Sequence, residues 1–336
     1  MQVEPSASDR GPHGGTLPAA RCPLPAVLST DSLLRFHVCF AGLLLAGAAI
    51  YFFPIVALGK LVFKNESYSH IAAVPVVGLY LLAMQRKHIL AVVERRSVAG
   101  FAVCAGGLLL YGIAFAIREH LSSPAFRNQD VPNDYLTLCM AGAVAWLIGS
   151  FIVSYGVRAF RKARFALLFL MFAIPIPMFL LNGIITSLQY ASAGASDIIF
   201  GLTGAPYHRS GLAFDFPNFG VRVDVQCSGI RSSLSLFMLS IIAGYLFLRT
   251  VSRRVILTLA IFPITVVKNA FRIVTVTLLA HYVDIRFLAN HWIHQSGGIP
   301  FFAVGFMMFI PLLWVLRRSE RQQAAGSSKN ELAACS

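Results

Sequence analysis

The sequence predicts an all-α polytopic membrane protein with about eight transmembrane helices and a small external β-hairpin before the sixth. Two observations predict this class. Of the 336 residues, 57% are hydrophobic and only 12% are charged, against about 25% charged residues in an average soluble domain. Apolar runs of about 20 residues, the length that crosses the hydrocarbon core as a helix, recur along the chain. This composition argues against a soluble enzyme, a nucleic-acid-binding domain and a disordered chain.

The expected spans form one transmembrane domain over residues 36–316. They cover 36–58, 67–85, 97–117, 135–156, 165–182, 228–248, 255–280 and 294–316. Residues 1–35 are polar, rich in Pro and Gly, and lack the early apolar core of a signal peptide, so we expect a disordered cytoplasmic tail. Residues 317–336 form a second, basic cytoplasmic tail, which we also expect to be disordered.

The long segment 183–226, between the fifth and sixth spans, predicts an external structure in two parts. Residues 184–203 are moderately apolar but interrupted by Ser, Gly and Asp, which is typical of a helix lying on the outer leaflet. Residues 211–226 alternate as a strand does, with a turn at 217–220. We therefore expect a β-hairpin that leads into the sixth span.

The basic residues predict the orientation of the chain. The net charge is +14, from 28 Lys and Arg against 14 Asp and Glu. Of the 28, 18 lie in the two tails and in the loops after the second, fourth and sixth spans. Basic residues gather on the cytoplasmic side of membrane proteins, so both termini should be cytoplasmic. The surplus of basic residues is then explained by the orientation of the chain in the lipid bilayer, which is its partner, and a nucleic-acid partner is not needed to explain it.

The six cysteines are scattered, without a pair at metal-ligand spacing, so we expect neither a disulfide framework nor a metal site. Cys227 differs from the others in its position. It lies at the external mouth of the sixth span, where the positive end of the helix dipole favours the thiolate. Arg231 follows one turn later on the same face and favours it further. Cys227 is therefore the candidate nucleophile.

The seventh and eighth spans place two more chemical groups at the same side of the membrane. Arg272 lies about 8 residues, or ~12 Å, before the outer end of its helix, a long way for its side chain to reach the interface. We therefore favour a role inside the bundle. His294 lies at the outer mouth of the eighth span; an alternative reading pairs it with His291 as metal ligands, but no carboxylate accompanies them.

Helices joined by short loops usually pack side by side, so these three groups can meet at one depth. A thiolate that attacks a carbonyl, an imidazole that moves protons and a guanidinium that stabilises an oxyanion form a coherent catalytic set. The sequence thus predicts acyl-transfer chemistry at the outer face.

At these residues the chain resembles the exosortase/archaeosortase family. The resemblance covers about residues 40–316. Its strongest part is a set of three short motifs in order: Cys227-Ser-Gly-Ile-Arg231-Ser, Asn269-Ala-Phe-Arg272-Ile, and His294 followed by Gly298. Three weaker parts are Tyr68-Ser69-His70 with Pro75, the Ile174-Pro175-Ile176-Pro177 stretch, and the predicted hairpin.

The resemblance implies a cysteine protease or transpeptidase of the bacterial inner membrane that needs no cofactor. Its partners would be membrane-anchored precursors with a C-terminal sorting signal of the PEP-CTERM kind: a short motif, a transmembrane helix and a basic tail. The enzyme would cleave near the motif, on the periplasmic side, and transfer the protein to a surface acceptor such as an exopolysaccharide or a lipid. By position, Cys227, Arg272 and His294 would be catalytic, with Arg231, Asn269 and Gly298 in support.

Two other functions remain open from the residues. A transporter would use Lys268 and Arg272 to bind an anionic solute, but the expected pair of broken helices in two repeated halves is not visible. A membrane acyltransferase would use His294, which explains neither Cys227 nor the hairpin.

Overall fold

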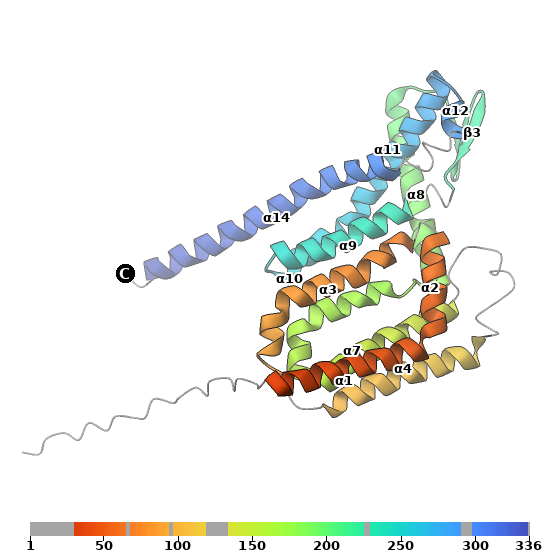
Figure 1. Cartoon of the computed structure of the whole chain (residues 1–336). Coiled ribbons are helices and arrows are strands. Elements are labelled where there is room, and N and C mark those ends of the chain that lie inside the picture. The colour runs from red at the N-terminus through yellow and green to blue at the C-terminus, as the bar shows by residue number, and fades with distance from the viewer. Residues whose placement is uncertain are drawn as a thin grey trace, which may run out of the picture.

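The computed structural model describes residues 30–64, 68–93, 97–118, 134–224, 229–289 and 298–334. The described chain is mostly helical and falls into two groups of helices (Figure 1). The N-terminal group contains α1 (Thr30–Ile50), α2 (Phe52–Lys64), α3 (Ser69–Leu90), α4 (Val98–Ala116) and α7 (Asp134–Phe169). The C-terminal group contains α8 (Met178–Thr203), α9 (Ile230–Phe247), α10 (Val251–Leu259), α11 (Ile261–Tyr282), α12 (Arg286–Ala289) and α14 (Gly298–Ala334).

Glycines bring α4 and α7 into backbone contact. A Cβ atom on Gly107 would lie 2.7 Å from the Gly142 carbonyl oxygen, and one on Gly149 would lie 2.9 Å from the Gly100 carbonyl oxygen. The two glycines of each helix are seven residues apart, so they share one face. Small residues at such spacing let membrane helices approach closely, where van der Waals packing replaces the hydrophobic effect.

A kink divides α7 into two helices. Gly156 has φ 88° and ψ 167°, a conformation that residues with a Cβ atom rarely adopt. The expected fourth span, 135–156, ends at this residue. The helix resumes and continues to Phe169, and a 3₁₀ turn, η2 (Leu170–Ala173), follows it.

The expected fifth span, 165–182, is wrong as a single helix. Residues 174–177 have no helical structure, and α8 begins at Met178. The cause is the pair of prolines, because proline donates no backbone hydrogen bond and pushes the residue before it out of the helical region. The Asp134 carboxylate accepts a hydrogen bond of 2.8 Å from the Met178 N–H and so caps the new helix.

The expected number of spans is not confirmed. In the described ranges, five helices are long and apolar enough to cross a membrane: Leu33–Ile50, Val98–Ala116, Asp134–Ala173, Val251–Tyr282 and Pro300–Gln323. Two apolar helices are shorter, Phe52–Phe63 and Ser232–Phe247. The expected first span is divided, because a turn at the buried Tyr51 separates α1 from α2.

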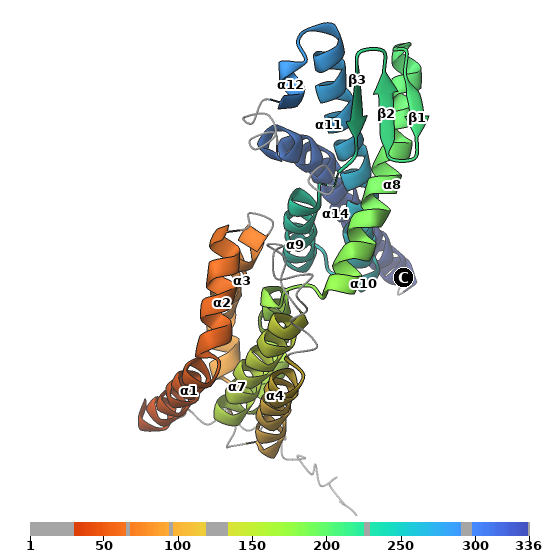
Figure 2. The ribbon, with the colours of Figure 1, turned by 90° about the vertical axis from the view of Figure 1, so that its right-hand side faces the viewer.

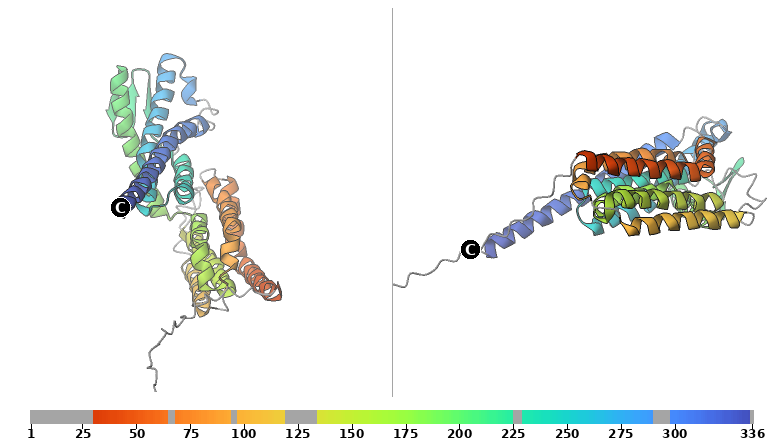
Figure 3. Two further views of the ribbon diagram at one scale, coloured as in Figure 1. Left: turned by 90° about the vertical axis from the view of Figure 1, so that its left-hand side faces the viewer. Right: turned by 60° about the horizontal axis from the view of Figure 1, so that its bottom comes forward.

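The C-terminal tail is helical and not disordered as expected. α14 continues to Ala334, because residues 317–334 contain no proline and many good helix formers such as Glu, Arg, Gln and Ala. Glu320 also ties it to the bundle, since its carboxylate accepts hydrogen bonds from the backbone N–H groups of Arg249 and Thr250 at the start of α10. Beyond this contact α14 leaves the other helices (Figure 3). The expected N-terminal tail lies mostly outside the described residues.

A small antiparallel sheet precedes α9. It has three strands in the order β1 (His208–Ser210), β2 (Ala213–Phe216) and β3 (Phe219–Arg222), where the sequence indicated two. In β2 the side chains of Phe214 and Phe216 are buried and that of Asp215 is exposed, as the alternation predicted. The buried face packs on α8 and α11, around Phe200 and Ile273 (Figure 2).

α9 joins the two groups of helices. Its Tyr245 ring stacks on Phe165 of α7, with ring centroids 3.6 Å apart. The Tyr245 hydroxyl also accepts a hydrogen bond of 2.7 Å from Gln85 Nε2 of α3. Met238, nearer the N-terminal end of α9, is buried with Val74 of α3.

Candidate active site

The structure describes four of the six predicted site residues. Cys227 and His294 lie outside the described residues. Arg231 is in the first turn of α9 and Gly298 is the first residue of α14, both with the backbone only described. Asn269 and Arg272 lie in the middle of α11 with their side chains. The chain is described on both sides of Cys227, up to Asp224 and from Gly229 onwards.

Two residues after Cys227, a glycine turn starts α9. Gly229 has φ 70° and ψ 14°, in the left-handed region that favours glycine. Its carbonyl oxygen accepts three hydrogen bonds: from Ser232 Oγ at 3.0 Å, from Ser233 Oγ at 2.6 Å and from the Ser233 N–H at 3.0 Å. The conformation of this turn is thus fixed by its own helix.

Asn269 joins this turn to two other helices. Its side chain is fully buried, and its Nδ2 donates a hydrogen bond of 3.0 Å to Ser192 Oγ of α8. A Cβ atom on Gly229 would lie 3.2 Å from Asn269 Oδ1. The carboxamide therefore lies against the turn, and a side chain at position 229 would collide with it.

The chain before Cys227 is also fixed. The Val223 N–H donates to the Leu212 carbonyl at 2.9 Å, and the Val223 carbonyl accepts from Gln189 Nε2 of α8 at the same distance. Val223 is 1% exposed. Both flanks of segment 225–228 are therefore attached to α8, by Gln189 on one side and through Ser192 and Asn269 on the other.

Two cations lie one turn apart on α11 beside this turn. Lys268 is 2% exposed, and its ammonium donates a hydrogen bond to Ser232 Oγ. α14 covers its stem, because a Cβ atom on Gly305 would lie 3.1 Å from Lys268 Cδ. Arg272 is half-buried and close enough for the two charges to repel each other. In the described chain its guanidinium forms no ion pair.

A polar cluster attaches the sheet to α8. Tyr207 Oη donates to Asp197 Oδ1 at 2.8 Å, and Arg209 Nη1 forms an ion pair with Asp197 Oδ2 at 3.0 Å. The hydrogen bond from Tyr207, with the Arg209 charge, lowers the pKa of the Asp197 carboxyl. The strands that precede segment 225–228 are thereby attached to α8.

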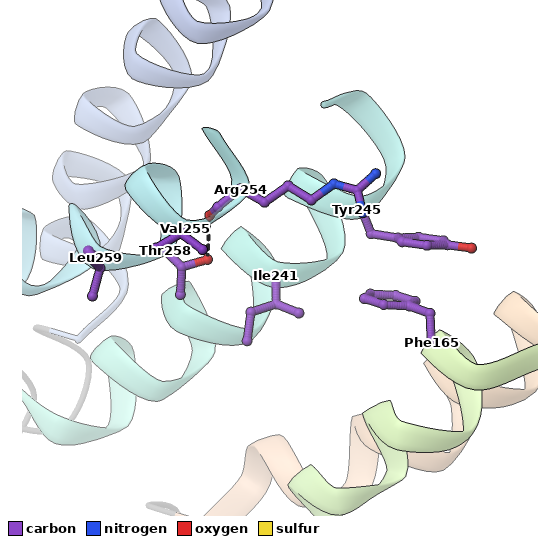
Figure 4. Close-up of a pocket in the computed structure, with 7 residues that line it drawn as sticks. All are labelled: Phe165, Ile241, Tyr245, Arg254, Val255, Thr258 and Leu259. Atoms are coloured by element: carbon purple, nitrogen blue, oxygen red, sulfur yellow. Dashed lines mark hydrogen bonds between the residues drawn. The ribbon is translucent and has the colours of Figure 1, made fainter. Parts of the chain in front are cut away.

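A pocket of about 230 Å³ lies elsewhere, between α7, α9 and α10 (Figure 4). It is lined by Phe165, Ile241, Tyr245, Arg254, Val255, Thr258 and Leu259. Tyr245 is 16 residues beyond Gly229 on α9, or about 24 Å along the helix axis. None of the predicted site residues lines this pocket, so it is not the predicted site. Among the described residues no group of three or more His, Cys, Asp or Glu is placed to hold a metal.

The polar residues that hold the turn were not among the predicted site residues. They are Gln189 and Ser192 of α8 and the two serines that follow Arg231. The α8 pair had a usable signal, because Gln189, Ser192 and Ser196 recur at helical spacing within an otherwise apolar stretch and so share one face.

The fold and this site define a polytopic membrane protein whose C-terminal helices surround the Gly229 turn, two residues after Cys227, with buried polar and cationic side chains. The chain belongs to the transmembrane exosortase family: a family model described as "Transmembrane exosortase" matches residues 62–311. The matched region includes Cys227, Arg272 and His294. No curated protein and no solved structure matches the chain.

Proposed function

We propose that this exosortase is a membrane cysteine transpeptidase that cleaves C-terminal sorting signals of the PEP-CTERM kind and transfers the cleaved protein to a surface acceptor. Membership of the exosortase family supports the general role. One structural observation supports Cys227 as the nucleophile: the chain is held on both sides of its segment, at Val223 by a buried hydrogen bond from Gln189 of α8 and at Gly229 by close packing against Asn269, which donates a hydrogen bond to Ser192 of α8. Chemistry at a thiol requires this kind of fixed geometry.

In the proposed reaction the Cys227 thiolate attacks the carbonyl carbon of the scissile peptide bond. Arg272 stabilises the negative charge that develops on the carbonyl oxygen. His294 protonates the leaving amine, and the bond to nitrogen breaks to leave a thioester on Cys227. His294 then removes a proton from the acceptor nucleophile, which attacks the thioester and releases the thiolate. Hydrolysis is the same second step with water as acceptor.

The surroundings of Arg272 support its role. A guanidinium carries five N–H donors and cannot be deprotonated in proteins. The side chain is half-buried, and no hydrogen bond or ion pair occupies it within the described ranges. Its donors are therefore available for a substrate oxygen. The asparagine three residues before it, Asn269, lies against the Gly229 turn and places Arg272 about one helical turn from it.

The arrangement of charged and polar segments supports a periplasmic active site. The start of α1, the end of α14 and α10 with its arginines lie at one end of the molecule, and the sheet and α12 lie at the other (Figure 1). By the positive-inside rule the first end is cytoplasmic. The proposed orientation therefore has both termini in the cytoplasm and the sheet above the outer leaflet of the inner membrane.

Three substitutions test this function: Cys227→Ala, Arg272→Ala and His294→Ala. The substrate is a reporter that ends in a Pro-Glu-Pro motif, an apolar helix and a basic tail, and its cleavage in membranes is followed on gels. Each variant should accumulate normally and lose processing. Cys39→Ala, which removes a half-buried thiol from α1, is the matched control and should process normally. Full processing by Cys227→Ala would overturn the proposal.

The transporter alternative is less well supported. The Lys268 ammonium is enclosed by protein and is already bonded to Ser232, and the family is one of exosortases. If uptake of an anion depended on Arg272 while Cys227 were dispensable, the transporter would replace the enzyme as the better account.

A further inference from the structure

Lys268 is a buried cation with no role in the mechanism above. It lies within a candidate membrane span and is 2% exposed. Neither of the ion pairs found in the described part of the chain involves it, and the like charge of Arg272, one turn away, repels it. Ionisable side chains inside a membrane are costly, and those that persist usually serve a function.

The hydrogen bonds of Ser232 indicate a role for the Lys268 ammonium. A hydroxyl has one proton to donate, whereas an ammonium can only donate. Because Lys268 donates to Ser232 Oγ, the single proton of Ser232 is free to point at the Gly229 carbonyl, 3.0 Å away. The ammonium therefore polarises and orients the hydroxyl, and hydrogen bonds that involve a charged group are stronger than neutral ones.

We propose that Lys268 and Ser232 are positioning residues: the Lys268 ammonium orients the Ser232 hydroxyl, which helps to fix the Gly229 carbonyl, two residues after Cys227. The proposal deepens the proposed function and rests on it for its effect on catalysis. Under this proposal α11 has two functions at positions one helical turn apart. Lys268 helps to hold the Gly229 carbonyl, and Arg272 contacts the substrate.

A second contact explains why the ammonium stays in place. Gly305 of α14 lies against the Lys268 stem, so close that a Cβ atom there would be 3.1 Å from Lys268 Cδ. Leu236 of α9 lies on the other side of the same glycine, 3.5 Å from that position. Lys268 is thus enclosed by α9, α11 and α14, and its amine has little freedom to leave Ser232.

Kinetics of the full-length enzyme with the sorting-signal reporter test the proposal. Lys268→Met keeps the length of the side chain and removes the charge, and Ser232→Ala removes the hydroxyl. Each should lower kcat by about 10- to 100-fold with KM within twofold of wild type, because a misplaced nucleophile slows the chemistry and not the binding. Ser232→Thr keeps the hydroxyl and should restore most of kcat.

The double variant Lys268→Met with Ser232→Ala distinguishes a shared path from two independent effects. If Lys268 acts through Ser232, the double variant should be no slower than the slower single variant. Losses that multiply would overturn the proposal. The matched control is Thr265→Val, which removes another buried hydroxyl from α11 and should leave kcat unchanged. Wild-type kcat in a well-accumulated Lys268→Met enzyme would also overturn it.

A second readout does not require turnover. In a variant whose only cysteine is Cys227, the rate of alkylation by iodoacetamide is measured against pH. Lys268→Met and Ser232→Ala should each change this profile in the same direction, and Thr265→Val should not. An unchanged profile in both would overturn the positioning role. If the profiles change while Cys227→Ala still processes the reporter, the proposed function fails and the positioning of the turn stands.

Discussion

The two groups of helices are held together by different contacts. In the N-terminal group α4 and α7 approach through glycines, so that backbone meets backbone: a Cβ on Gly107 would lie 2.7 Å from the Gly142 carbonyl. In the C-terminal group α8, α9 and α11 are joined by buried polar side chains, such as Asn269 with Ser192 and Lys268 with Ser232. The glycine interface contributes no side chain that could act in catalysis, so we interpret it as a rigid support. Buried polar contacts cost more in a membrane, and they surround the proposed active site.

Breaking the glycine interface should have the largest effect. Gly107→Leu forces a side chain into the α7 backbone and should destabilise the protein by about 3 kcal/mol or more, with loss of both folded protein and processing. Gly106→Leu on the neighbouring position, which has nothing within 4 Å of its Cβ site, is the control. Protein recovered after detergent extraction and size-exclusion chromatography measures the difference. Equal recovery of the two variants would contradict the account of this interface.

Removing a functional side chain from the C-terminal helices should instead leave the fold intact. Arg272→Ala should lower kcat by about 100- to 1000-fold, the effect of removing one oxyanion-stabilising donor, while recovery stays normal. Arg286→Ala removes an 88% exposed guanidinium on α12 and should change nothing. If Arg272→Ala lowered recovery as much as Gly107→Leu does, Arg272 would belong to the scaffold and not to the site.

The Gly229 turn should combine both kinds of effect at smaller size. Gly229→Ala imposes a left-handed conformation on alanine, which costs about 1–2 kcal/mol, and brings its methyl group against Asn269. We expect a lower melting temperature together with slower processing. Gly201→Ala, in a helical part of α8 with open space around it, should raise or preserve stability. Normal kcat in Gly229→Ala would show that the turn tolerates displacement.

The sheet anchor should give the smallest effect and a defined pH dependence. Tyr207→Phe removes the hydroxyl that donates to the Asp197 carboxylate and to the Asp197 backbone carbonyl, and should cost about 1 kcal/mol. The pKa of Asp197 is lowered in the folded protein, so its contribution is present above the unfolded pKa of about 3.9 and is lost as pH falls through the folded pKa. The melting temperatures of wild type and Tyr207→Phe should therefore differ most at pH 7, and the difference should shrink as the pH falls below about 4. A difference that stays the same in acid would contradict this cause.

The sequence was informative where one local signal decides the structure. Apolar length indicated the membrane helices, including the end of the fourth span near Gly156, and alternation marked the buried face of β2. The sequence did not predict the contacts between segments that lie far apart in the chain. The Asp134 carboxylate that accepts from the first N–H of α8 lies 44 residues before it, and Glu320 of α14 accepts from the Thr250 N–H, 70 residues before it.

The same limit applied to the site. Arg272 was predicted from its depth within a span and Asn269 from the family resemblance, and both stay predictions as site residues. Ser232 was not found, because a serine near a helix start has an ordinary explanation in capping, and its partner lies 36 residues away on another helix. Ser192 was missed for the same reason, 77 residues from Asn269.

The central claim is that Cys227 becomes covalently attached to the substrate. The most direct test is to incubate the enzyme, with Cys227 as its only cysteine, with the sorting-signal reporter, quench in acid and search its peptides by mass spectrometry. The account predicts the N-terminal part of the reporter joined to Cys227 through a bond that hydroxylamine cleaves. Cleaved reporter without such an adduct, together with full processing by Cys227→Ala, would contradict it.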